Sequence, residues 1–216
     1  MTKYPYITSE QMENLVTKIL HNAGICVEWN GNISKVDIDY IIEFEYDLDI
    51  VWQDIDYLDS NGNILAAIKP SDKVIIMNES KKTLFSENMG TMNFSKAHEL
   101  GHWVLHVTGQ NDYEQLMFLP TDIYHCRNVG KREPEEVQAD MFAASILMPK
   151  GVITGAITEL KKKGYVSFRE LYLLKDKLEV SISALVARIN TLKLLYIVDK
   201  KIYLSEDERT KQLSLF

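Results

Sequence analysis

The stretch that constrains this chain most runs from Phe94 to His106 and reads FSKAHELGHWVLH. It places His98 and His102 four residues apart, with Glu99 directly after the first histidine. Residues four apart share one face of an α-helix, so both imidazoles can point at one metal ion. Imidazole nitrogen suits Zn²⁺, and Glu99, about 100° further round the helix, can act as a base toward a water on that ion. The spacing predicts half of a catalytic zinc site.

The alternative is a helix that carries these polar residues without a metal. Most of the neighbouring residues are small or apolar, namely Ala97, Leu100, Gly101, Val104 and Leu105. This composition indicates a buried helix. Burying two histidines and a glutamate without partners would be costly, and a metal would remove that cost. Gly101 also offers a small residue where a neighbouring element can pack closely.

A catalytic zinc ion normally has three protein ligands and a water, so a third ligand must come from another element. The best candidate is Glu136, in the segment EEVQADMFAASILMP. Asp140 lies four residues later on the same helix face and can accept a hydrogen bond from a ligand imidazole. Glu135 is the rival ligand, although it shares no face with Asp140. Both glutamates are also explained as charges that favour a helix start.

The segments HELGHWVLH and EEVQADMFAASILMP together resemble the ImmA/IrrE family of zinc metallopeptidases. That family carries a His-Glu-Leu-Gly-His helix and then a helix of the pattern Glu-x-x-Ala-Asn/Asp-x-Phe-Ala, followed by Leu-Leu-Met-Pro. The stretches IIMNESKKTLFSENMGTMNFSKAHELGH and LEVSISALVARINTLKLL are also similar, so the resemblance covers roughly residues 10–198. The chain departs from the pattern at Ile146, where leucine is commoner, and in its long connection between the two helices.

The resemblance implies that His98, His102 and Glu136 bind Zn²⁺ and that Glu99 is the catalytic base and acid. It also implies a zinc endopeptidase that cuts a regulatory protein, often a helix-turn-helix repressor of a mobile element or stress regulon. The chain shows no evident repressor domain of its own, so the substrate would be a separate protein. The alternative is a non-proteolytic protein, such as an antirepressor, whose zinc domain only binds a partner.

Two further histidines need an interpretation. His106 lies about two turns, or ~12 Å, from His98, so one zinc ion cannot easily be held by both. We therefore interpret His106 as a structural residue at the helix end or one that supports a ligand. The pair His125 and Cys126 lies in the long connection, where an ordinary loop role is favoured over a gate or a fourth ligand.

The expected fold is α+β: a mainly helical, zincin-like metallopeptidase domain with a small antiparallel sheet, then a helix-turn-helix-like unit and a hairpin. The expected domains are residues 1–150, 151–204 and a flexible tail over 205–216. Helices are predicted to start at Thr8, at Ser34, at Thr91 or Asn93, at Pro134, at Ser167 and at Ser181, and strands over 48–52, 63–68 and 73–77. A closing hairpin is predicted around Asp199 and Lys200.

Charge and hydropathy narrow the class of protein. The net charge is −7, and only Arg188 is basic near the start of the second helix of the helix-turn-helix-like unit, so direct DNA binding is not expected. No apolar run approaches the ~20 residues of a membrane helix. With no signal-peptide core, a cytoplasmic protein is expected. Cys26 and Cys126 give no disulfide framework.

The last five residues, Gln212, Leu213, Ser214, Leu215 and Phe216, read QLSLF. This segment resembles the peptide by which bacterial DNA polymerases and repair proteins dock on the replication sliding clamp. There the glutamine makes polar contacts while the apolar residues fill a cleft. The alternatives are that these apolar residues fold back on the protein's own surface or bind a second copy of it.

Overall fold

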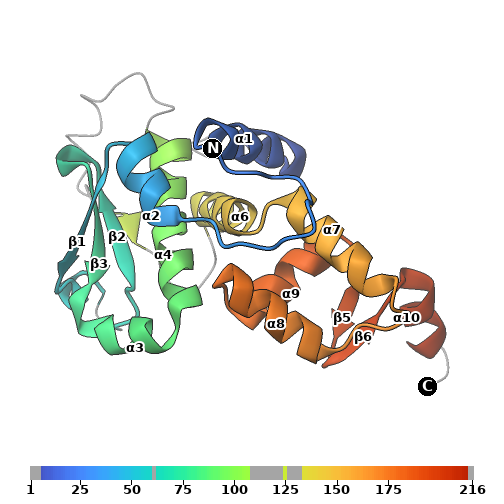
Figure 1. Cartoon of the computed structure of the whole chain (residues 1–216). Coiled ribbons are helices and arrows are strands. Elements are labelled where there is room, and N and C mark those ends of the chain that lie inside the picture. Colours follow the sequence, from blue (N-terminus) through green and yellow to red (C-terminus); the bar gives the residue numbers. More distant parts are fainter. Residues whose placement is uncertain (1–5, 60–61, 108–123, 126–132, 214–216) are drawn as a thin grey trace.

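Helices make up most of the molecule, with a small sheet at one end and a helical unit at the other (Figure 1). The computed structural model describes residues 6–59, 62–107, 124–125 and 133–213, of which 124–125 and 211–213 are described by their backbone alone. Helix α6 (Pro134–Leu147) lies between α4 (Met89–His102) on the sheet side and α1 (Ser9–Asn22) on the other. One large apolar core therefore runs through all three helices.

The sheet confirms the predicted strands, with one correction to their directions. Strand β2 (Ala66–Lys69) and β3 (Val74–Asn78) form an antiparallel hairpin, whereas β1 (Asp49–Gln53) pairs with β3 in parallel. The order is β1-β3-β2-β4, where β4 is Tyr124–His125. The sheet is therefore mixed. A tight turn dictates the direction of β2 against β3, but a long connection separates β1 from β2, so no turn dictates the direction of β1.

Most predicted helix starts are confirmed, and the exceptions have local causes. Thr8 and Gln11 form a capping box for α1. The second helix, α2 (Ile38–Tyr40) followed by a π-helical segment η1 (Ile41–Glu45), begins after Asp37 rather than Ser34, because the Asp37 side chain accepts the N–H of Tyr40.

Helix α4 begins earlier than predicted, directly after Asn88. The predicted cap residues Thr91 and Asn93 therefore lie inside the helix. Asn93 instead donates a hydrogen bond to the carbonyl of Glu179, at 3.1 Å. A residue type suited to capping serves here as a tie between α4 and the C-terminal unit. Helix α3 (Lys82–Glu87), which precedes α4, was not predicted.

The C-terminal unit follows the predicted helix, turn, helix and hairpin order. Its elements are α7 (Lys150–Lys161), α8 (Phe168–Leu178), α9 (Ile182–Thr191), β5 (Tyr196–Val198) and β6 (Lys201–Tyr203). Ser167 and Ser181 cap α8 and α9 as expected. Within the segment predicted to be a tail, helix α10 (Glu206–Leu213) forms, because Ser205 accepts the N–H of Glu208 and the first turn is acidic.

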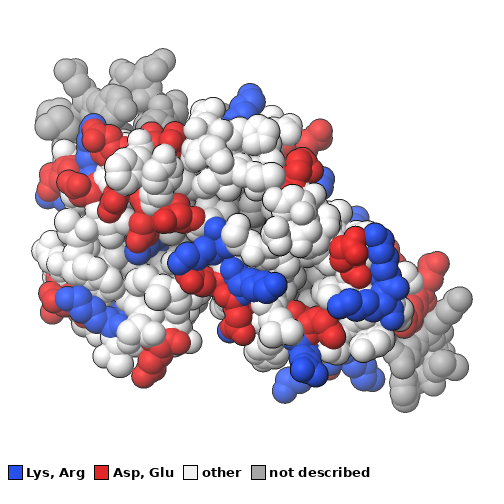
Figure 2. All heavy atoms as spheres, in the orientation of Figure 1, with Lys and Arg blue, Asp and Glu red and all other residues white. Residues whose placement is uncertain are grey.

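Arg188 belongs to the core of the structure rather than to a surface. Its guanidinium makes a two-pronged ion pair with Glu13 of α1, at 2.6 and 2.9 Å, and donates to the carbonyl of Met148. Only 4% of Arg188 is exposed. The one basic residue of the second helix thus ties the C-terminal unit to the N-terminal helix. On the face seen in Figure 2, acidic and basic side chains alternate over the C-terminal unit.

The helices were compared with the length and apolar character that a membrane-spanning helix needs. Among the described residues no single helix has the length and apolar character to cross a bilayer, and only α6 and α7 together, bent by 61°, pass by length and composition.

Candidate metal centre

Two neighbouring helices bring together three side chains that could hold a metal ion. His98 and His102 come from α4, and Glu136 comes from the first turns of α6. The Nε2 atoms of the two histidines lie 2.9 Å apart, and the Glu136 carboxylate oxygens lie 3.3 Å from His98 Nε2 and 3.4 Å from His102 Nε2. The three donor atoms all lie within 4.8 Å of one another. Glu136 rather than Glu135 completes this group.

Gly101 explains how the two helices come so close. A Cβ atom added to it would lie 3.2 Å from the Cα of Ala139 and 3.2 Å from the Cβ of Phe142, both on α6. Such distances are tighter than most side-chain contacts, so only glycine lets the backbones approach freely at this point. The prediction that a neighbouring element packs closely at Gly101 is confirmed. The contact lies between the two histidines in sequence and positions them opposite Glu136.

Asp140 supports the first histidine as expected. Its Oδ1 lies 3.0 Å from Nδ1 of His98. A carboxylate there holds the proton on Nδ1 and leaves Nε2 pointing toward Glu136 and His102. Asp140 is one turn after Glu136 on α6. One face of this helix therefore carries both the candidate ligand Glu136 and the residue that orients His98.

Glu99 lies beside the three ligands without joining them. Its side chain is fully buried, and within the described residues neither carboxylate oxygen accepts a hydrogen bond of normal geometry. The backbone N–H of Ile68, in β2, still favours its ionised form. Burial is the main cause that raises the pKa of Glu99 from 4.5 to about 8. A buried carboxyl group with a raised pKa, next to a cluster of candidate ligands, suits a residue that exchanges protons.

The pKa values of the three candidate ligands are shifted in directions that suit a cation between them. Burial alone would lower the pKa of His98, but its bonds to Asp140 and Glu136 outweigh this and raise it to about 10. Burial would raise the pKa of Glu136, but both histidines lower it to about 2. Burial lowers the pKa of His102 to about 4. The same donors are deprotonated when they bind a metal ion, which would supply the positive charge at this point.

Residue His106 lies in the π-helical segment η5 (Trp103–Val107), directly after α4. Its Nδ1 lies 3.0 Å from Nδ1 of His102, and its Nε2 lies 3.0 Å from Oε1 of Gln138. It is therefore a neighbour of a ligand, as interpreted from its spacing. Gln138 was missed, because a single glutamine on a helix shows nothing of its partner.

Two sets of predicted residues cannot be placed at the site. The backbone of His125 forms part of β4 opposite Ala67 of β2, while its side chain and Cys126 lie outside the described residues. The side chains of Gln212 and Leu213, and all of Ser214, Leu215 and Phe216, also lie outside them.

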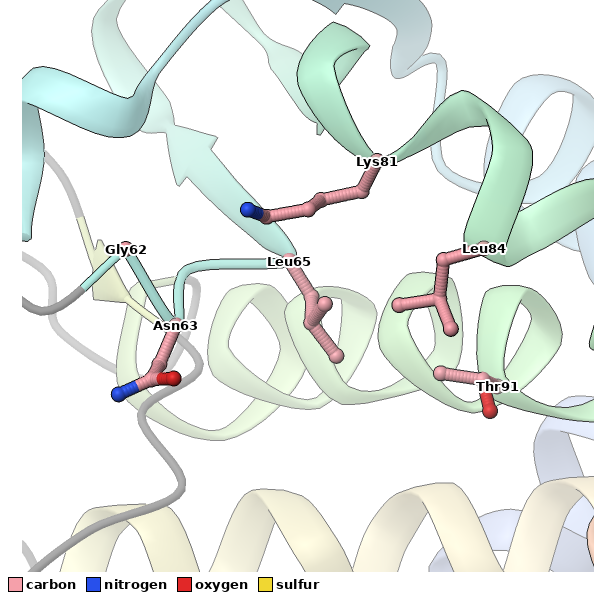
Figure 3. A pocket seen from close by; sticks show the side chains of 6 residues that line it. All are labelled: Gly62, Asn63, Leu65, Lys81, Leu84 and Thr91. Carbon is pink, nitrogen blue, oxygen red and sulfur yellow. The ribbon is translucent and has the colours of Figure 1, made fainter.

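A hollow of about 370 Å³ lies along the same helix, nearer its start. Figure 3 shows Leu65 and Leu84 pointing into it, with Lys81 across its upper edge. Its lining is formed by Gly62, Asn63, Leu65, Lys81, Leu84 and Thr91. Thr91 precedes His98 by about two turns, or ~10 Å along α4. Leu65 directly precedes β2, whose Ile68 contacts Glu99, so α4 and β2 both lead from this pocket toward Glu99.

The residues present fit a metal ion. Two imidazole nitrogens and a carboxylate face a common point, an aspartate orients one imidazole, and a carboxyl group with no full hydrogen bond lies alongside. Two histidines and a glutamate form a frequent ligand set of catalytic zinc.

Comparison with known proteins identifies the family. The IrrE N-terminal-like domain of the M78 peptidases matches residues 73–190, more than half of the 216 residues. A search of curated proteins found no match. The matched segment contains His98, Glu99, His102 and Glu136. The chain belongs to the M78 family of metallopeptidases, with an IrrE N-terminal-like domain.

Proposed function

We propose that this protein is a zinc-dependent endopeptidase that cleaves a regulatory protein in the cytoplasm. The observation that carries the proposal is the cluster of His98, His102 and Glu136, which lies beside a buried glutamate with a raised pKa. A zinc ion held by the three ligands would act as a Lewis acid toward the scissile carbonyl and the attacking water.

Each residue of the site has a separate task in this proposal. Glu99 takes a proton from the attacking water and delivers it to the leaving amine, a role that fits its buried position beside the three candidate ligands. Asp140 keeps the His98 ring in one orientation. The apolar core around α4 excludes bulk water from the buried side of Glu99.

The family resemblance and the pocket both support a proposal for the substrate class. The resemblance supports a helix-turn-helix repressor of a mobile element or stress response as the target. The pocket at Leu65 and Leu84 supports a peptide substrate, because Thr91 in its lining lies ~12 Å along α4 from Glu99, a distance that a few residues of an extended peptide span.

A second proposal concerns a partner rather than the reaction. The QLSLF segment supports docking on a bacterial sliding clamp, which would bring the peptidase to replicating or damaged DNA through a protein. The buried ion pair of Arg188 leaves the second helix of the C-terminal unit without that cation for a phosphate, which agrees with a protein-mediated route.

Cleavage tests separate the peptidase from a protein that only binds a partner. Purified protein with zinc is incubated with candidate repressors encoded nearby, in parallel with Glu99→Gln and Glu136→Gln. We expect cleavage by the wild type alone, metal retention by Glu99→Gln and metal loss in Glu136→Gln. A stable complex with a repressor and no cleavage would favour the binding alternative. Cleavage by Glu99→Gln at the full rate would exclude the proposed base.

A further inference from the structure

The two candidate histidine ligands are supported by different chemistry. The far nitrogen of His98 meets a carboxylate, Asp140, whereas the far nitrogen of His102 meets another imidazole, that of His106. His106 in turn meets the amide oxygen of Gln138. His102 and His106 are both 0% exposed, and Gln138 is 6% exposed. The chain from His102 through His106 to Gln138, called here the His106–Gln138 relay, is therefore shielded from bulk water.

Metal binding at His102 would determine which atom donates and which accepts in each hydrogen bond of this relay. A neutral imidazole carries one N–H and one free nitrogen, and the free nitrogen binds the metal. With Nε2 of His102 on the metal, its proton lies on Nδ1 and is donated to Nδ1 of His106. The proton of His106 then lies on Nε2, where it is donated to Oε1 of Gln138. An amide oxygen can only accept, so every position in the relay has one consistent role.

The relay also solves a charge problem. Glu99 and Glu136 already place two carboxyl groups around the ligands, and Asp140 adds a third. Another carboxylate behind His102 would be a buried anion among these, which carries a large desolvation and repulsion cost. A neutral imidazole that ends on a neutral amide orients His102 without adding charge.

We infer that His106 and Gln138 are positioning residues that hold His102 in its metal-binding tautomer and orientation. The inference rests on the proposed metal centre. Hydrogen-bonded partners of this kind contribute about 10–100-fold to metal affinity. Loss of the relay should therefore weaken metal binding while the three ligands remain in place.

The test measures zinc affinity at pH 7 by competition with a chromophoric chelator. His106→Leu cannot accept a hydrogen bond, and we expect its affinity to fall about 10–100-fold. His106→Gln can accept through its oxygen and donate through its nitrogen, so it should recover most of that loss. Gln138→Leu should weaken binding less than His106→Leu, because His106 can still accept the proton of His102. His21→Asn, an exposed histidine of α1, is the matched control and should leave affinity unchanged.

A second readout separates positioning from a general loss of stability. The melting temperature of each variant is measured without metal and with saturating zinc, because only binding contributes the increment between them. We expect a smaller increment in His106→Leu, whatever its metal-free value. Equal zinc affinity in His106→Leu, His106→Gln and the wild type would overturn the inference. If Glu136→Gln also kept full affinity, the metal centre itself would be wrong.

Discussion

Replacing Glu99 should make the metal-free protein more stable while it removes activity. The wild-type carboxyl group is completely buried and lacks a full hydrogen bond, so folding forces it to take up a proton at neutral pH. Glutamine has nearly the same shape as a protonated carboxyl group and needs no proton. Glu99→Gln therefore keeps the packing and removes the cost of protonation.

The magnitude follows from the shift in pKa, from 4.5 to about 8. Because the pKa is raised, the folded protein binds more protons than the unfolded chain, and stability falls as pH rises between these two values. Each pKa unit corresponds to about 1.4 kcal/mol. The advantage of Glu99→Gln should be under ~1 kcal/mol at pH 5, ~3 kcal/mol at pH 7 and 4–5 kcal/mol, roughly, at pH 8.5.

Urea unfolding in the presence of a chelator measures this at the three pH values, and thermal melts at pH 7 should show a gain of roughly 6–12 °C. Glu135→Gln, at the half-buried start of α6, removes a charge without removing a buried carboxyl group and serves as the control. A stability difference that is absent, or that does not grow with pH, would refute the view that Glu99 is held in a costly environment for its chemistry.

Three other substitutions test separate features. Arg188→Met should destabilise the protein by about 1–3 kcal/mol in urea unfolding, because the half-buried carboxylate of Glu13 loses its cation and keeps only the hydroxyl of Ser145. Leu84→Trp should fill the pocket and lower kcat/KM for a protein substrate by about tenfold or more, with zinc affinity unchanged. Removal of the residues after Lys211, or Phe216→Ala, should abolish binding to a bacterial sliding clamp in a titration, and equal binding by the intact and shortened chains would contradict the docking proposal.

The candidate ligands that lie within one helix could be predicted from spacing alone. The geometry of a helix fixes where His98, Glu99 and His102 point relative to one another, so the sequence determines that part of the site directly. Glu136 required more, because its position depends on how two helices pack. Gly101 indicated where another element packs closely, because a small residue between the histidines allows two backbones to approach there.

The rest depended on contacts between distant segments. Nothing in the residues around Gln138 indicates that it meets His106, and nothing around Arg188 indicates Glu13. The parallel pairing of β1 with β3 escaped prediction for the same reason, because each strand alone is compatible with either direction. Helix starts were wrong where a second capping residue competed, as Asp37 did with Ser34.

The ion pair between Arg188 and Glu13 shows that the segment matched by the family is not the same as the structural unit that contains it. The family match spans residues 73–190 and contains Arg188, but Glu13 lies outside it, as do β1 and β2. A protein cut to the matched segment would keep every ligand yet lose the carboxylate opposite a buried guanidinium and the strand that covers Glu99. The part of the chain that matches the family is therefore smaller than the part whose contacts enclose Glu99 and Arg188.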